Sequence, residues 1–70
     1  MLFTDVSSER VVRTLGKVGF AVVRSAKHMV LTDGTRLVTV PRHKRLNPYT
    51  LRSIIRDAGL TDEAFRELLR

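Results

Sequence analysis

The stretch that decides the fold reads HMVLTDGTRLVTVP and runs from His28 to Pro41. Two segments rich in β-branched residues flank Asp33 and Gly34, and both of these residues tolerate the positive φ that a two-residue type I′ turn requires. The pattern therefore predicts a β-hairpin whose strands cover 28–32 and 36–40, with the final proline stopping the second strand.

A turn of two residues also sets the register of this hairpin. His28 then lies across from Thr39, and Met29 lies across from Val38. One face of the hairpin carries apolar side chains that suit a core: Met29, Leu31, Val38 and Val40. The opposite face is mixed: His28, Val30, Leu37 and Thr39. We expect only the apolar face to be buried.

Upstream of the hairpin the sequence predicts a helix and one more strand. Ser7 or Ser8 can cap the helix, because a side-chain oxygen accepts the unpaired N–H groups of a first turn. Apolar residues then recur at helical spacing: Val11, Val12, Leu15 and Val18. Gly19 is expected to end this helix. The segment Phe20–Arg24 is β-branched and aromatic, which favours a strand, and 25–27 forms the turn into the hairpin.

Downstream the sequence predicts two further helices. Asn47 and Pro48 are typical of an N-cap followed by proline at the first helical position. The apolar stripe of that helix comprises Leu51, Ile54, Ile55 and Ala58. Gly59 closes it, and Thr61 caps a short last helix. The residues expected to pack inward from the last helix are Ala64, Phe65, Leu68 and Leu69.

The predicted element order is α-β-β-β-α with a short C-terminal helix, which places the chain in the α+β class. An antiparallel three-stranded sheet with the helices on one face is the simplest way to bury the apolar stripes. Seventy residues form at most one small domain, so we predict a single domain over 1–70. This order is shared with double-stranded RNA-binding domains, which read the shape and 2′-hydroxyls of A-form RNA.

The charge of the chain is large and unevenly distributed. The formal net charge is +6 with a pI near 11.2. The segment from Arg10 to Arg56 contains eleven Lys or Arg residues and a single carboxylate, Asp33, whereas the two ends are net acidic. The densest run is 42–45 (Arg-His-Lys-Arg). A solvated loop in an Arg-rich chain is one explanation, but concentrated cations favour a nucleic-acid partner.

Composition narrows the remaining classes. There is no Cys, so disulfides, a thiolate nucleophile and a zinc knuckle are excluded. No apolar run approaches the roughly 18 residues that span a bilayer, and no charged-then-apolar leader opens the chain. We therefore expect a cytoplasmic protein that does not contact membranes.

Two histidines, His28 and His43, are the only side chains with an ordinary pKa near neutrality. Cleavage of RNA by its own 2′-OH needs a base and an acid, and imidazole can serve as either, while Arg or Lys stabilises the charged phosphorane. The alternative is that each histidine is a surface imidazole with an ordinary hydrogen bond. Two histidines with no nearby carboxylate pair do not predict a metal site, so we expect chemistry without metal or cofactor.

Taken in order, the motifs resemble those of the HicA-type (YcfA-like) mRNA interferase toxins. The residues that carry this resemblance are Gly19-Phe20, Val23-Arg24, His28 after a tight turn, Asp33-Gly34, Val38 to Pro41, the run Thr50 to Thr61, Phe65 and Leu68-Leu69. The similarity covers roughly residues 7 to 69, and the run from Thr50 to Thr61 is its most specific part.

The resemblance implies a fold like the double-stranded RNA-binding domain, cleavage of single-stranded mRNA without a metal, and neutralisation by a HicB-like antitoxin. It also implies that His28 is the catalytic histidine, because the family's Gly-Ser-His motif ends at this position. Ala26 and Lys27 stand where Gly and Ser are usual. Lys27 can either depress the pKa of the imidazole or anchor the scissile phosphate.

Our leading hypothesis is thus a metal-independent endoribonuclease, the toxin of a toxin–antitoxin pair. His28 is the expected general base or acid, and His43 is a possible second proton carrier. The candidate RNA-binding residues are Arg24, Lys27, Arg42, His43, Lys44 and Arg45. An acidic antitoxin surface would cover the same basic region. Two alternatives remain open: a non-catalytic RNA-binding module of the same fold, and a basic subunit that only binds an acidic protein.

Overall fold

The computed structural model describes residue 3 and residues 5–69. Its elements are α1 (Ser8–Gly16), β1 (Ala21–Ser25), β2 (His28–Thr32), β3 (Leu37–Pro41), α2 (Pro48–Asp57) and α3 (Asp62–Leu69). This order confirms the predicted α+β class. The single domain predicted over 1–70 also includes residues 1, 2, 4 and 70, which lie outside the described residues.

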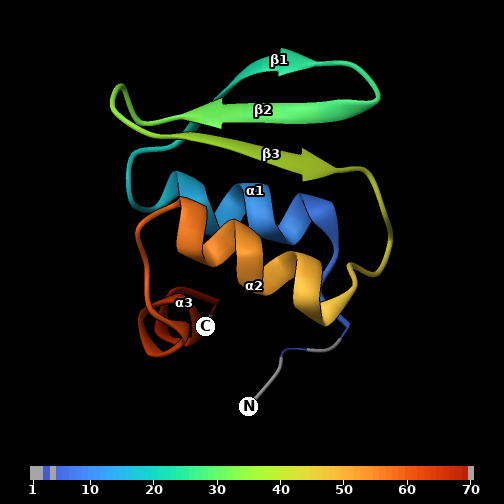
Figure 1. Cartoon of the computed structure of the whole chain (residues 1–70), viewed down its shortest axis with the longest axis vertical. Coiled ribbons are helices and arrows are strands. Elements are labelled where there is room, and N and C mark those ends of the chain that lie inside the picture. The colour runs from blue at the N-terminus through green and yellow to red at the C-terminus, as the bar shows by residue number, and fades with distance from the viewer. Residues whose placement is uncertain (1–2, 4, 70) are drawn as a thin grey trace.

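The three strands form one antiparallel sheet in the order β1-β2-β3. Helices α1 and α2 lie side by side against one face of this sheet, and α3 packs against both of them (Figure 1). The opposite face is not covered by any element among residues 5–69 (Figure 1). None of the described helices has both the length and the apolar character needed to cross a membrane.

The core lies between the sheet and the helices. The predicted apolar face of the hairpin is confirmed, since Leu31, Val38 and Val40 are fully buried and Met29 is nearly so. Helices α1, α2 and α3 contribute the other large buried side chains: Val11, Leu15, Leu51, Ile55 and Phe65. The mixed face points to solvent, and Leu37 there keeps 66% of its surface exposed.

The predicted register of the hairpin is wrong by two residues. His28 pairs with Pro41 and Met29 pairs with Val40, because the connection after Thr32 has four residues rather than two. Only Gly34 has a positive φ in this turn, so a type I′ geometry is absent. Instead the carboxylate of Asp33 accepts the backbone N–H groups of Thr35 at 2.9 Å and of Arg36 at 2.7 Å, which closes a longer turn.

The predicted helix starts are confirmed, whereas one helix end is wrong. Ser7 is the N-cap of α1 and accepts the N–H of Arg10, and Asn47 caps α2 by accepting the N–H of Tyr49. Helix α1 ends at Gly16 instead of Gly19, and β1 starts one residue later than predicted. As a result Val18 lies outside the buried stripe, with 39% of its surface exposed.

Candidate functional site

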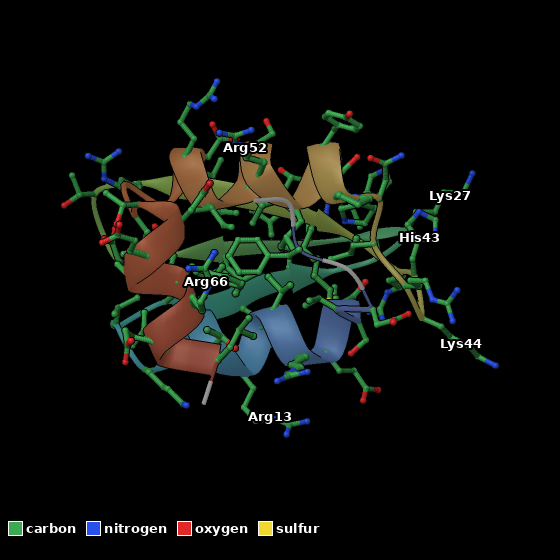
Figure 2. All side chains as sticks on the ribbon, turned by 90° about the horizontal axis from the view of Figure 1, so that it is seen from below. Arg13, Lys27, His43, Lys44, Arg52 and Arg66 are labelled. Carbon is green, nitrogen blue, oxygen red and sulfur yellow. The ribbon has the colours of Figure 1, made fainter. Side chains whose placement is uncertain are left out.

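Three segments that are distant in the sequence meet at one end of the sheet. They are the β1–β2 turn, the loop after β3 and the first turn of α1, all at the right-hand side of Figure 1. Lys27, His43 and Lys44 project from this end, whereas Arg13, Arg52 and Arg66 lie elsewhere on the helices (Figure 2). Most of the candidate residues predicted from the sequence therefore gather in one region.

His28 lies on the uncovered face of the sheet. It is the first residue of β2, and its side chain is exposed. Together with its neighbours it lines a shallow hollow of about 370 Å³, whose other lining residues are Arg24, Ala26, Lys27, Val30 and Thr39. Across the part of the chain that the structure describes, the side chains of Arg24 and Lys27 have no hydrogen-bond or ion-pair partner. An imidazole thus shares an open hollow with two available cations.

His43 lines a different hollow, of about 520 Å³, on the helix side of the sheet end. This hollow lies between the first turn of α1 and the loop after β3, and Met29 lines it from β2. Successive residues of a strand point to opposite faces, so Met29 faces the helices while His28 faces away from them. The structure therefore does not place the two imidazoles in the same hollow.

Ser8 joins the basic loop to α1. Its side chain is buried, with only 4% of the residue exposed. The hydroxyl donates to the carbonyl oxygen of Pro41 and accepts the N–H of His43 at 2.7 Å. The backbone N–H of Ser8 in turn donates to the carbonyl oxygen of His43 at 3.0 Å. These three bonds fix the path of the loop, a role that adjacent serines in the sequence did not reveal.

Arg42 also binds the protein itself. Its Nε donates to the carbonyl oxygen of Ala26 at 2.7 Å, and its Nη2 donates to the hydroxyl of Ser25. The guanidinium therefore links the end of β3 to the turn that immediately precedes His28. Sequence reasoning identified Arg42 only as a cation, because no local pattern indicates a contact across 16 residues.

Lys44 and Arg45, the last two candidate residues of the basic run 42–45, differ in their contacts. The Nε of Arg45 lies 2.7 Å from the Oδ1 of Asp5, in an ion pair between two exposed side chains. Lys44 is exposed and has no such partner among residues 5–69. Among the described residues, no group of three or more His, Cys, Asp or Glu side chains is placed to hold a metal ion.

Comparison with known proteins adds one finding. Residues 8–60 match the model of a family described as the HicA toxin of bacterial toxin–antitoxin systems. The matched region contains α1, the whole sheet and α2, and therefore every residue that lines the two hollows except Ser7. A search of curated proteins found no match.

Proposed function

The chain belongs to the HicA family of toxins from bacterial toxin–antitoxin systems, and we propose that it is a metal-independent endoribonuclease that cleaves mRNA. The observation that carries this proposal is the hollow on the open face of the sheet, where the exposed His28 lies with Arg24 and Lys27. An imidazole can carry out one of the two proton transfers in phosphodiester cleavage by a 2′-hydroxyl, and unpaired cations can stabilise the charge that develops on the phosphoryl oxygens.

In the proposed reaction the 2′-oxygen of a ribose attacks the adjacent phosphorus, and the bond from phosphorus to the 5′-oxygen breaks. The 2′-hydroxyl loses its proton and the leaving 5′-oxygen gains one. The products are a 2′,3′-cyclic phosphate and a 5′-hydroxyl. His28 performs one of these two proton transfers, and Arg24 and Lys27 balance the charge that develops on the phosphoryl oxygens. Because His43 lines the other hollow, a water molecule carries out the other proton transfer in this proposal: it supplies the proton if His28 is the base, and accepts it if His28 is the acid.

We further propose that a HicB-like antitoxin neutralises this activity by covering the basic end of the sheet. The open face around His28 and the exposed cations Lys27 and Lys44 offer an accessible positive surface. An acidic protein surface bound there would exclude RNA by simple occlusion. Growth arrest on expression of the chain, relieved by co-expression of the neighbouring gene, is the expected result in cells.

The direct test compares the wild type, His28→Ala and His43→Ala on single-stranded mRNA in EDTA. We expect wild type and His43→Ala to release fragments with 2′,3′-cyclic phosphate ends, and His28→Ala to lose cleavage while still binding RNA. Full cleavage by His28→Ala would overturn the assignment of this residue. Binding with a steep salt dependence but no cleavage by any variant would instead favour an RNA-binding module. Absence of RNA binding would leave only the protein-partner function.

A further inference from the structure

The hollow on the helix side contains unpaired groups of both signs. Glu9, His43 and Lys44 line it, and within residues 5–69 none of their side chains has a hydrogen-bond or ion-pair partner. Its strand-side lining includes Met29, a residue that is 9% exposed. A carboxylate and an ammonium group that line one hollow without pairing can each bind a different part of the same ligand.

The walls of this hollow are held in place by the backbone. Ser7 and Ser8 cap and begin α1, and Ser8 fixes the backbone of His43 through bonds of 2.7 and 3.0 Å. The same loop is held a second time further along the chain, where the N–H of Leu46 donates to the carbonyl oxygen of Val6 at 2.8 Å. A hollow whose two walls are joined in this way is preformed, as ligand sites usually are.

We propose that this hollow binds one nucleotide of the RNA, next to the nucleotide whose phosphodiester is cleaved at His28. The base lies against Met29 and the His43 ring, its amino group donates to the carboxylate of Glu9, and its phosphate contacts Lys44. A nucleotide matches this lining because it combines an aromatic ring, N–H donors for the carboxylate and an anionic phosphate for the ammonium group. This inference rests on the proposed function, because it assumes that RNA is bound at this end of the sheet.

Arg42 places the two hollows beside each other. The guanidinium belongs to a residue that lines the helix-side hollow, and its Nε bonds to Ala26, which lines the hollow of His28. One residue thus links the linings of the two hollows. An RNA strand that crosses the end of the sheet can therefore occupy both with neighbouring nucleotides.

Glu9 also determines which base is preferred. An ionised carboxylate only accepts hydrogen bonds, through two oxygens. Guanine presents two adjacent donors on its Watson–Crick edge, the N1–H and the N2 amino group, whereas uracil presents a single N3–H between two acceptors. The carboxylate of Glu9 therefore favours guanine over uracil, and a bidentate pair of this kind accounts for roughly a 5- to 150-fold preference.

The test uses short RNAs that cannot be cleaved, so that binding is measured separately from activity. The 2′-O-methyl pentanucleotides UUGUU, UUIUU (with inosine, which lacks the N2 amino group) and UUUUU are titrated into the full chain by fluorescence anisotropy. We expect the wild type to bind UUGUU at least about fivefold more tightly than UUUUU, with UUIUU in between. In Glu9→Gln the preference for UUGUU over UUUUU should fall below about twofold.

Glu63→Gln is the matched control, because Glu63 also lies in the first turn of a helix but belongs to α3. It should keep the wild-type preference, and circular dichroism should show that both variants are folded. Equal binding of UUGUU and UUUUU by the wild type, no binding of either, or a preference that survives in Glu9→Gln would overturn the proposal. Cleavage of ordinary mRNA is scored separately, so a wild type that cleaves mRNA but shows no base preference rejects this site alone.

Discussion

At the scale of single residues, Arg42 illustrates how little a basic run reveals about the role of each cation. Its neighbour Lys44 is exposed and unpaired among the described residues, whereas Arg42 directs two N–H groups to Ala26 and Ser25. The β1–β2 turn that it holds leads directly into His28. Arg42 is therefore better described as a positioning residue for the proposed site than as a free phosphate contact.

Arg42→Lys should separate these two roles, because lysine keeps the charge but cannot form the two-pronged contact. We expect kcat for RNA cleavage to fall about tenfold or more, since a small displacement of a catalytic group is costly, with KM changed by less than about threefold. Steady-state kinetics on a defined RNA measures both parameters. Adding Ser25→Ala to Arg42→Lys should cost little more, because both changes remove the same contact. A raised KM with unchanged kcat would contradict this role.

Ser8 is the second residue whose contribution is structural. Replacement by Ala leaves the part-buried N–H of His43 and the carbonyl oxygen of Pro41 without their partner. We expect Ser8→Ala to lower the free energy of unfolding by about 1–3 kcal/mol. Ser7→Ala removes only an exposed N-cap and should cost about 1 kcal/mol. Urea denaturation of the two variants compares them directly, and an equal or smaller loss for Ser8→Ala would show that water replaces the bonds.

At the scale of elements, the hairpin shows which features of the fold local sequence determines. The strand residues were identified to within one position, and the buried face was correct although the register was wrong. Side chains alternate between the two faces of a sheet with a period of two residues. A register shift of two residues therefore changes the partner of every residue but leaves each side chain on the same face. His28 was therefore placed correctly on the open face even though its partner is Pro41 rather than Thr39.

The candidate site could be predicted only in part for a related reason. The exposure of His28 follows from strand alternation, which is local. The position of His43 depends on the path of a loop that Ser8 holds from 35 residues away. The contact of Arg42 with the β1–β2 turn depends in turn on the observed register. Long-range contacts of this kind leave no periodic signal, so the separation of the two histidines was not foreseen.

The β2–β3 turn makes a prediction of its own. The backbone N–H of Arg36, and then that of Thr35, lowers the pKa of Asp33 below its ordinary value. A lowered pKa in the folded state means that Asp33 stabilises the protein above its unfolded pKa of about 3.9 and that this contribution is lost as the pH falls below it. Asp33→Asn should therefore reduce the melting temperature at pH 7 and narrow the difference in melting temperature between pH 7 and pH 3.

Thermal denaturation of the wild type and Asp33→Asn at both pH values provides this measurement. Asp57→Asn is a suitable control, since Asp57 is an exposed carboxylate at the end of α2. If Asp33→Asn and the wild type lose the same number of degrees between pH 7 and pH 3, the turn does not depend on the ionised carboxylate.

At the scale of the whole molecule, the cations fall into two groups. Many of them hold the fold together: Arg10 of α1 and Lys17, the residue that follows this helix, donate to the carbonyl oxygens of Leu69 and Leu68, respectively, in the last turn of α3. Arg52 pairs with Asp62 at 3.5 Å, and Arg66 lies 5.6 Å from the ring centre of Phe3. Others remain unpaired among the described residues, and Arg24, Lys27 and Lys44 of this group lie at the same end of the sheet. Fewer cations are therefore free to bind a polyanion than the net charge of the chain indicates, and three of the free cations lie close to one end of the sheet.

This division predicts how RNA binding responds to salt. Each phosphate contact releases counterions, so the slope of log K against log salt for a single strand changes by about 0.7 for each contact. Arg24→Gln, Lys27→Gln and Lys44→Gln should each make the slope shallower by about this amount. Arg13→Gln removes the same charge from an exposed position on α1, away from the sheet end (Figure 2), and should leave the slope unchanged. Titration of a 2′-O-methyl RNA between 50 and 200 mM salt measures this slope. Equal changes of the slope in all four variants would mean that RNA binding depends on the net charge of the molecule and not on a defined site.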